Sequence, residues 1–340
     1  MSDLIVITHR LDIPAGRQLA AQWPQARRVV VCPHLADRCE AEGLPVELLR
    51  LPGLEVPWDA YRQARADAQR LQGRLDEVLA VFDPMAPGCD WLQHDLFYTL
   101  YTLRGFASIW SRAVQLHPQA TWHVPLPDLA FRYGCHSYLP ALSLLERLGA
   151  AGRPLKAYGH ALPPWDADRL PDLAALPHEQ TVDLISHLPT CFYDHAHFEE
   201  ALVASGQRVL NLRSQHYDVP VERLPSAPMA PLAQVRAALA PAVLDRIETV
   251  LVAAAEVLRA GLAPFIASPR YLAPQVQTLV DLLRRQMVFS ASLATHFDHR
   301  PARTLVLSNH DTGLHGPLLS HARRHRSKVL LVPHSKIFNA

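Results

Sequence analysis

The chain has 340 residues, nearly balanced charge and an ample apolar share: 33 Lys and Arg stand against 32 Asp and Glu, the net charge is +1, and 49% of the residues are hydrophobic. This composition supports a buried core in one large or two medium domains and excludes a disordered chain. It gives no support to non-specific nucleic-acid binding, which needs a basic excess. No apolar run approaches the ~20 residues that span a bilayer and no leader-like segment opens the chain, so we expect a cytoplasmic protein and leave peripheral membrane association open.

The first fifty residues alternate between apolar runs and helical patterns. Runs at 3–8, 28–32 and 46–51 predict strands, and the segments 16–23 and 35–42 between them predict helices. Because the runs are continuous rather than alternating, they predict a parallel sheet covered on both faces, which is a Rossmann-like α/β fold. The first turn reads THRLDIPAG and lacks the G-x-G-x-x-G pattern, which argues against dinucleotide binding there.

The same alternation continues along the rest of the chain, with a helical block before its last strands. The expected helices are 58–81, 91–116, 137–148, 195–204, 230–262, 274–295 and 317–325. The expected strands are 121–124, 154–158, 181–185, 208–212, 304–308 and 328–332. A proline-rich loop is expected at 163–177, and helix breaks are expected around Pro264 and Pro269.

These elements predict three segments: a Rossmann-like domain over 1–229, a helical insertion over 230–300, and a strand-helix-strand unit over 301–340 that completes the same sheet. The chain ends a few residues after a strand with the pattern of a central strand, so we expect either a truncated chain or a subunit that something else completes. Five cysteines without a C-x-x-C pair predict reduced, mostly buried thiols rather than disulfides or a sulfur-rich zinc site.

Histidines follow many of the predicted strands. The strand-end histidines are His9, His34, His160, His187, His310 and His334. Ligands of parallel sheets bind where the carboxyl ends of the strands converge, so these imidazoles are expected to face one rim if the strands share a sheet. For each histidine taken alone, a structural role at the strand end is the alternative.

The segment 308–317, SNHDTGLHGP, is the densest group of polar residues between a predicted strand and helix. Asp311 lies between His310 and His315 and is a candidate general base or nucleophile, with Asn309 beside it. The small residues allow close backbone approach, and the helix N-terminus offers amides to an anion. The alternative is a turn in which Asp311 caps the helix.

Two further loops contain similar chemistry. His334, Ser335 and Lys336 follow the last strand and are expected to bind phosphate or carboxylate, unless they form a solvated loop. Asp194, His195 and His197 are interpreted as a helix cap and first turn rather than metal ligands, and Cys191 lacks an activating arrangement, so we expect no thiol nucleophile.

The Asn-His-Asp run is similar to the G-N-H-D element of binuclear metallophosphoesterases. The partner motifs of that class, D-x-H, G-D-x-x-D and G-H-x-H, are missing from the chain, so a two-metal centre cannot be assembled from it. We therefore expect no resident metal and no cofactor.

The final forty residues, including VLSNHDTGLHGPLLSHARRHRSKVLLVPHSK, resemble the end of the N-terminal domain in bacterial cell-surface polysaccharide glycosyltransferases of the two-Rossmann-domain (GT-B-like) type. In that group a strand, a polar loop and a helix are followed by a strand that ends in Pro/Gln-His-Gly. Here the strand ends in Pro333-His334-Ser335, so serine replaces the glycine, and the resemblance covers about a tenth of the chain.

The resemblance implies a transferase that moves a sugar from a nucleotide-sugar donor to a bacterial surface glycan such as lipopolysaccharide or capsule. It implies an N-terminal domain that holds the acceptor and the catalytic group, with the donor bound by a second domain, which we expect to lie outside this chain. A rim rich in histidine and lysine would suit a CMP-activated acidic sugar such as Kdo.

On this basis we divide the candidate residues by role. The catalytic candidates are Asp311, His310 and His315. The substrate-binding candidates are His9, His34, His187, Asn309, His334, Ser335 and Lys336. Two alternatives stay open, namely an Asp/His hydrolase of a phosphate or glycan and a non-catalytic glycan-binding domain.

Overall fold

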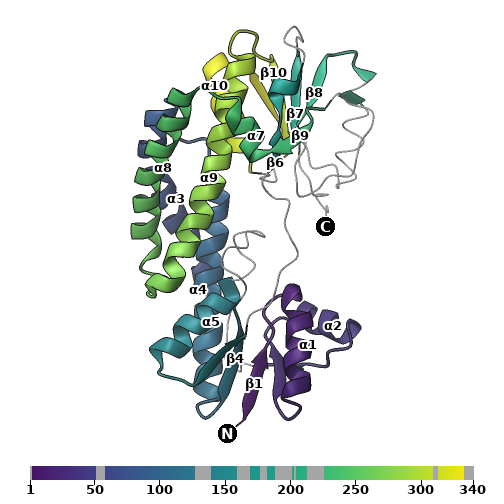
Figure 1. Ribbon diagram of the computed structural model, residues 1–340, viewed down its shortest axis with the longest axis vertical. Coiled ribbons are helices and arrows are strands. Elements are labelled where there is room, and N and C mark those ends of the chain that lie inside the picture. Colours follow the sequence, from purple (N-terminus) through teal and green to yellow (C-terminus); the bar gives the residue numbers. More distant parts are fainter. Residues whose placement is uncertain are drawn as a thin grey trace. The chain divides into compact units, whose positions relative to one another are not determined.

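The computed structural model describes residues 2–50, 58–126, 139–158, 169–176, 182–187, 201–202, 204–212, 226–308 and 313–332. Over these residues the chain is an α/β protein whose larger sheets are parallel and flanked by helices (Figure 1). It divides into two compact units, which are described separately. Unit 1 comprises Met1–Leu71, Asp95–Trp165 and Leu258–Leu279, and unit 2 comprises Gln72–His94, Asp166–Val257 and Val280–Ala340.

Unit 1 contains a five-stranded parallel sheet in the order β3-β2-β1-β4-β5. Its strands are β1 (Asp3–Val6), β2 (Arg27–Val30), β3 (Glu47–Leu48), β4 (Thr121–Pro125) and β5 (Leu155–Tyr158). Its helices are η1 (Arg10–Asp12), α1 (Ile13–Gln22), α2 (Pro33–Ala41), α4 (Gln93–Leu116) and α5 (Leu139–Ala150), although the first two residues of α4 belong to unit 2. This strand order, with β1 central, is that of a doubly wound sheet and confirms the predicted fold class.

The first strand is buried on both faces because successive side chains point to opposite sides of a sheet. Leu4 and Val6 pack with Trp110 of α4, whereas Ile5 and the following Ile7 pack in a second cluster with residues of α1 and α2. Figure 1 shows α1 and α2 on one side of these strands and α4 and α5 on the other. The continuous apolar run of β1 therefore belongs to a parallel strand that is covered on both faces, as the sequence predicted.

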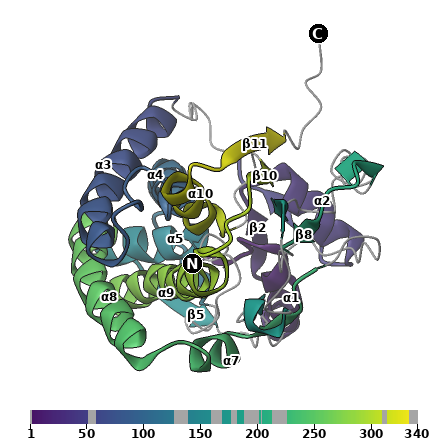
Figure 2. The same cartoon turned by 90° about the horizontal axis from the view of Figure 1, so that it is seen from above.

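Unit 2 contains a second parallel sheet, of four strands, in the order β11-β10-β7-β8. Its strands are β7 (Leu184–His187), β8 (Val209–Asn211), β10 (Thr304–Ser308) and β11 (Lys328–Val332). A separate antiparallel pair consists of β6 (Arg169–Pro171) and β9 (Met229–Pro231). The unit also contains η2 (Leu173–Ala175), α7 (Leu232–Ala237) and α10 (His315–His325), and Figure 2 shows α10 beside β10 and β11.

Besides α4, three long helices contribute residues to both units. They are α3 (Trp58–Phe82), α8 (Pro241–Leu262) and α9 (Pro269–Phe297). In the described part of the chain, no helix is both long and apolar enough to cross a membrane.

Strand β11 differs from its neighbours in burial. Leu305, Val306 and Leu307 of β10 are fully buried, whereas Leu330 and Leu331 of β11 are 48% and 65% exposed. Among the described strands, β11 pairs with β10 alone and forms the end of the sheet. The sequence pattern predicted a central strand here, and the structure corrects it to an edge strand.

The predicted domain division is also corrected. Residues 1–229 were expected to form one sheet that the segment 301–340 completes, but β7 and β8 belong to one sheet with β10 and β11 and not to the sheet of unit 1. Apolar runs identify strands but do not show which strands pair. The same sequence pattern is therefore expected whether the strands form one sheet or two. The predicted insertion, 230–300, contains part of β9 as well as α7, α8 and α9.

Candidate functional site

The carboxyl ends of β7, β10 and β11 lie in register at one edge of the sheet in unit 2. His187, the last residue of β7, pairs with Leu307 of β10, and Ser308 pairs with Val332 at the end of β11. The candidate segments that follow β10 and β11 therefore leave the sheet from adjacent strands. Their residues lie outside the described part of the chain: Asn309, His310, Asp311, His334, Ser335 and Lys336.

Two of the predicted site residues come together at this edge. The ring of His187 is 5.9 Å from the ring of His315, between centroids, and the two planes are nearly perpendicular at 82°. His187 is fully buried at the end of β7, and His315 is the first residue of α10. The sequence predicted both residues as site candidates, and the structure shows that they are in contact.

The hydrogen bonding of His187 defines its protonation state. Its Nδ1 atom lies 2.8 Å from the carbonyl oxygen of Leu212, so Nδ1 bears the hydrogen and donates it. Burial, and then the neighbouring His315, lower the pKa of His187 to about 3. The ring is therefore neutral near pH 7, and its Nε2 atom carries a lone pair.

The first turn of α10 adds hydrogen-bond donors to the same edge. Leu314 is the N-cap residue and makes no side-chain cap hydrogen bond, and Gly313 before it has a φ of +79°, which a glycine adopts without strain. The first amides of a helix have no carbonyl partners within the helix, and the helix dipole makes this end favourable for anions. Because Pro317 has no amide hydrogen, the amides of His315 and Gly316 are the donors of this turn, and with the His315 imidazole they suit a phosphate or carboxylate.

Sequence reasoning missed Arg285 of α9. Its guanidinium donates to the carbonyl oxygen of Arg169 at 2.8 Å, and its charge is a further cause of the lowered pKa of His187. The residue is part of an Arg-Arg pair in a long amphipathic helix, where the sequence predicts solvent-exposed charge. Only the fold shows that one of the two arginines approaches the histidine edge.

Gly316 has a packing role that competes with the predicted close approach to a ligand. A methyl group on this residue would lie 2.8 Å from the Cα atom of Trp91, which is closer than side-chain carbons approach a backbone. Trp91 is fully buried, and its indole Nε1 donates to Ser320 Oγ at 3.2 Å. The glycine is therefore explained by the contact between α10 and Trp91.

His9 and His34 belong to unit 1 and follow β1 and β2 at the carboxyl edge of the other sheet. His9 is the N-cap of η1, and its Nδ1 accepts a hydrogen bond from the amide of Leu11 at 3.2 Å. Asp12 accepts hydrogen bonds from the amide and hydroxyl of Thr8 and from the amide of His9, each at 2.8 Å. These bonds favour the structural alternative for His9, whereas His34 is exposed on α2.

The prediction of a single rim of histidines is therefore corrected to two edges in two sheets. His187 and His315 lie at one, and His9 and His34 at the other. The remaining candidates named in the sequence lie outside the described residues: His160, Cys191, Asp194, His195 and His197. Cys32, Cys39 and Cys89 are free, and the last two are buried, which agrees with the expected thiols.

Unit 1 also contains a cavity of about 560 Å³ between α3, α4 and the segment after α8. Arg104 and Phe265 line it, and the guanidinium of Arg104 lies 4.8 Å from the centre of the Phe265 ring. Arg104 also forms an ion pair with Asp67. None of the site residues predicted from the sequence lines this cavity, so it is separate from the histidine edges.

Comparisons with protein-family models, with curated proteins and with solved structures give no match. The chemistry of the site therefore has to be argued from its own residues.

Proposed function

We propose that the chain is a glycosyltransferase that transfers a sugar from a nucleotide-activated donor to a glycan acceptor. Two separate parallel sheets within one chain are compatible with the two-Rossmann-domain architecture that the sequence resemblance implies. In this proposal unit 2 takes the place of the donor domain that was expected outside the chain, which departs from the resemblance, because the final forty residues resemble the end of an N-terminal domain and belong to unit 2. Fold alone does not determine an activity, so the proposal depends on the site in unit 2.

The observation that carries the proposal is the contact between His187 and His315 at the carboxyl edge of the second sheet, beside the first turn of α10. A nucleotide diphosphate needs donors for several oxygen atoms and a positive potential around them. The first amides of α10, the imidazole of His315 and the nearby charge of Arg285 supply both, while the neutral His187 packs against His315. We therefore assign the diphosphate of the donor to this edge.

Asp311 keeps its proposed role as base or nucleophile on the sequence argument, since it lies four residues before His315. As a base, its carboxylate takes the proton of the acceptor hydroxyl while that oxygen bonds to the anomeric carbon. The bond from this carbon to the phosphate oxygen breaks, and the nucleotide leaves with the electron pair. Hydrogen bonds to the departing phosphate at the histidine edge lower the barrier for this step.

The two alternative functions, a hydrolase and a glycan-binding domain, would use the same edge of the sheet. A hydrolase would pass the phosphate or glycan to water instead of an acceptor hydroxyl, and a glycan-binding domain would perform no turnover. The cytoplasmic location and any contact with a membrane surface stay predictions of the sequence.

The experiment begins with calorimetric titration of the full chain with CMP, UDP and GDP and with the corresponding nucleotide sugars. Nucleotide release is then measured with and without oligosaccharide acceptors. Release that depends on an acceptor, together with a new glycosidic product, supports the transferase. Release in water alone favours the hydrolase, and binding of glycan without any nucleotide binding favours the non-catalytic alternative.

For the catalytic carboxylate we predict that Asp311→Asn lowers turnover by about 100-fold or more and leaves nucleotide affinity within about twofold, because general-base catalysis contributes about 10²–10⁴-fold. The matched control is Asp245→Asn, which changes an exposed carboxylate on α8 and should retain full turnover. Steady-state kinetics and calorimetry measure both quantities. Normal turnover in Asp311→Asn would remove the residue from the mechanism.

A further inference from the structure

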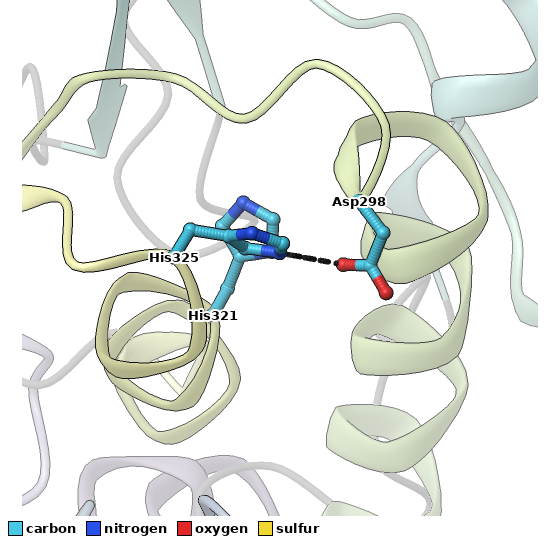
Figure 3. Close-up of side chains that lie close together, drawn as sticks. All are labelled: Asp298, His321 and His325. Carbon is cyan, nitrogen blue, oxygen red and sulfur yellow. Dashed lines mark hydrogen bonds and ion pairs between the residues drawn. The ribbon is translucent and has the colours of Figure 1, made fainter.

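A second group of histidines lies at the opposite end of α10, and the proposed function does not use it. His321 and His325 are four residues apart on this helix, so both rings lie on one face. They approach Asp298, the first residue after α9, as Figure 3 shows. Two histidines at this spacing on one helix face form a recurrent part of zinc sites.

The ligand atoms of the three residues lie close enough to surround one ion. One atom from each residue can be chosen so that all three lie within 4.8 Å of one another. His325 Nε2 is 2.8 Å from Asp298 Oδ1, and His321 Nδ1 is 3.7 Å from the same oxygen. Ligands of a tetrahedral zinc ion, at about 2.0–2.1 Å from the metal, are about 3.3 Å apart, so small side-chain rotations suffice.

The buried state of His321 is the second, independent observation. Its side chain is 2% exposed, and neither ring nitrogen has a hydrogen-bond partner among the described residues. A buried polar atom without a partner costs free energy, and native proteins rarely retain one without a reason. A metal ion bound to one ring nitrogen of His321 would supply that reason.

The charges around the cluster are compatible with a cation. Arg324 forms ion pairs with Asp83 and with Asp298. Two carboxylates therefore face this guanidinium and offset its positive charge beside the ligand atoms.

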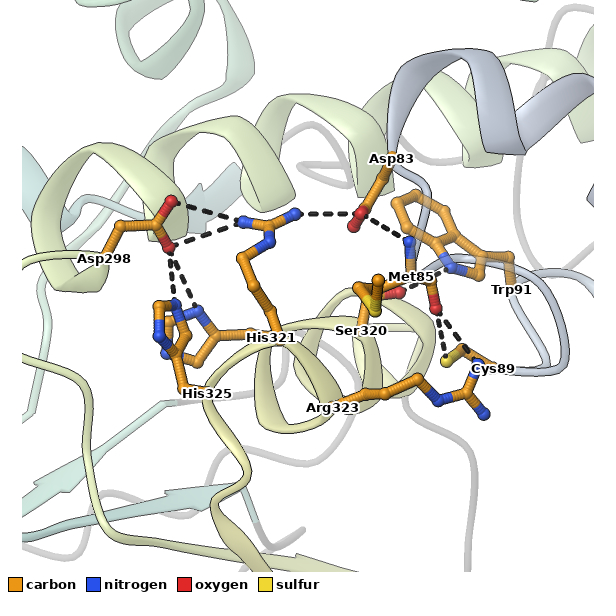
Figure 4. A network of polar contacts seen from close by, with 10 residues as sticks. Asp83, Met85, Cys89, Trp91, Asp298, Ser320, His321, Arg323 and His325 are labelled. Atoms are coloured by element: carbon orange, nitrogen blue, oxygen red, sulfur yellow. Dashed lines mark hydrogen bonds and ion pairs between the residues drawn. The ribbon is translucent and has the colours of Figure 1, made fainter.

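Asp83 is linked to the cluster through Arg324, which pairs with both Asp83 and Asp298, and Figure 4 shows Asp83, Asp298, His321 and His325 in the same polar network. Asp83 is 2% exposed, and its Oδ1 atom accepts from the amide of Met85 at 2.9 Å and pairs with Arg324 at 2.9 Å. Arg324 Nη1 lies 3.3 Å from Oδ2 of Asp298. The same nitrogen lies 3.4 Å from Oδ1, so Arg324 contacts both carboxylate oxygens and orients the carboxylate, as outer partners do in metal sites.

From this geometry we propose that Asp298, His321 and His325 bind one divalent transition-metal ion of the zinc class, with water at a fourth position. Imidazole ligands favour zinc, cobalt and nickel over magnesium and calcium, which prefer oxygen. Asp298 precedes β10 and His325 precedes β11, so the site lies at the amino edge of the sheet, opposite the His187–His315 edge. Its role is to fasten the end of α10 to the end of α9, rather than to act on a substrate.

Without a metal, the cluster would consist of a hydrogen bond between His325 and Asp298 and a buried His321. That account explains the 2.8 Å contact but leaves both nitrogens of His321 unexplained. A metal ion accounts for the approach of all three side chains and for one of the two His321 nitrogens.

The test uses the full chain, stripped of metal with a chelator and titrated with Co²⁺ and then with Zn²⁺. We expect one Co²⁺ per chain with the visible absorption of a four-coordinate site, displacement of Co²⁺ by Zn²⁺, and a higher melting temperature with Zn²⁺ bound. These readouts do not depend on catalysis, so they can fail or succeed independently of the glycosyltransferase assignment.

The variants are Asp298→Asn and His325→Gln, with His117→Gln in unit 1 as the matched control. We expect each ligand variant to weaken Co²⁺ binding by more than about 100-fold, since even loss of a residue that only hydrogen-bonds to a ligand costs about 10–100-fold. The control should bind Co²⁺ as the original chain does. Circular dichroism of Asp298→Asn, whose side chain is 35% exposed, verifies folding. Absence of Co²⁺ binding by the folded chain, or unchanged binding in the folded ligand variants, would overturn the proposal.

Discussion

His187 and His321 are both buried in unit 2, and both have a lowered pKa, but their ring nitrogens differ in hydrogen bonding. His187 donates a hydrogen bond to the carbonyl oxygen of Leu212, which fixes its tautomer and orients its other nitrogen. His321 makes no such bond among the described residues. Environment rather than residue type therefore separates a histidine with a fixed tautomer from one assigned to a metal.

The lowered pKa of His187 predicts that the protein loses stability in acid. The unfolded state binds a proton near pH 6.5, whereas the folded state does so only near pH 3. The stabilising difference is therefore fully present above pH 6.5 and is lost as the pH falls towards 3, by up to about 1.4 kcal/mol per pH unit. Urea unfolding at pH 7, 6 and 5 measures this slope.

His321 contributes a slope of the same sign, so a variant is needed to isolate His187. The amide nitrogen of His187→Asn can still donate to the carbonyl oxygen of Leu212 but does not titrate in this range. We expect a flatter dependence of unfolding free energy on pH in this variant. Equal slopes in both proteins would show that His187 does not titrate as its burial implies.

At this scale the sequence predicts strand-end residues well, because a residue that follows an apolar run lies at the edge of a parallel sheet. His187 was found in this way, and His315 was found as part of the polar segment between a strand and a helix. Asp298 and His321 were missed because residues far apart in sequence meet only through the packing of α9 against α10. The spacing of His321 and His325 was the available signal, but a helix of this length contains such pairs by chance.

At the scale of elements, the contact with Trp91 holds α10 in place. The helix has 11 residues, and its second residue, Gly316, has no room for a side chain. Ser320, one turn later, accepts the indole hydrogen bond of the same tryptophan. The helix is therefore held by close backbone approach at its start and by a hydrogen bond at its middle.

We predict that Gly316→Ala destabilises the protein by about 1–3 kcal/mol, because overpacking a filled core moves the backbone or the indole. The control is Gly105→Ala in α4, where nothing lies within 4 Å of the added methyl group. That change should stabilise the protein by about 0.5–1 kcal/mol, since alanine favours helix. Urea unfolding measures both, and a neutral or stabilising Gly316→Ala would contradict the close approach.

Elements with long apolar or periodic patterns were predicted within a few residues, as for α3, α4, β10 and β11. Short elements were not predicted correctly. Strands β6 and β9 have three residues each and contain proline, so the sequence predicted a loop and a helix there. Helix α9 begins at Pro269, earlier than expected, because proline is well suited to the first position of a helix.

At the scale of the whole molecule, the sequence predicted the α/β class but not the number of sheets. Each strand contributes the same apolar pattern whichever sheet it joins, and pairing depends on contacts between distant segments. The strands β7 and β10 are about 120 residues apart in sequence yet adjacent in the sheet. One sheet was therefore predicted where two exist.

The presence of two sheets makes the location of the donor site testable. We predict that the bound nucleotide slows amide hydrogen exchange in the segments that contain β7, β10 and the first turn of α10, and not in those that contain β1 and β2. Exchange measured by mass spectrometry with and without nucleotide makes the comparison. Protection confined to β1 and β2 would move the donor site to unit 1.

Strand β11 also affects how the molecule behaves in concentrated solution. Its outer edge pairs with no described strand, and its residues Leu330 and Leu331 are exposed. A sheet edge of this kind presents unpaired amides and carbonyls to any other strand, and natural proteins usually protect such edges with charge, proline or a covering segment. Lys328 is the one charged residue within the strand. Colloidal stability of the chain therefore depends on β11 more than on the small net charge of the surface as a whole.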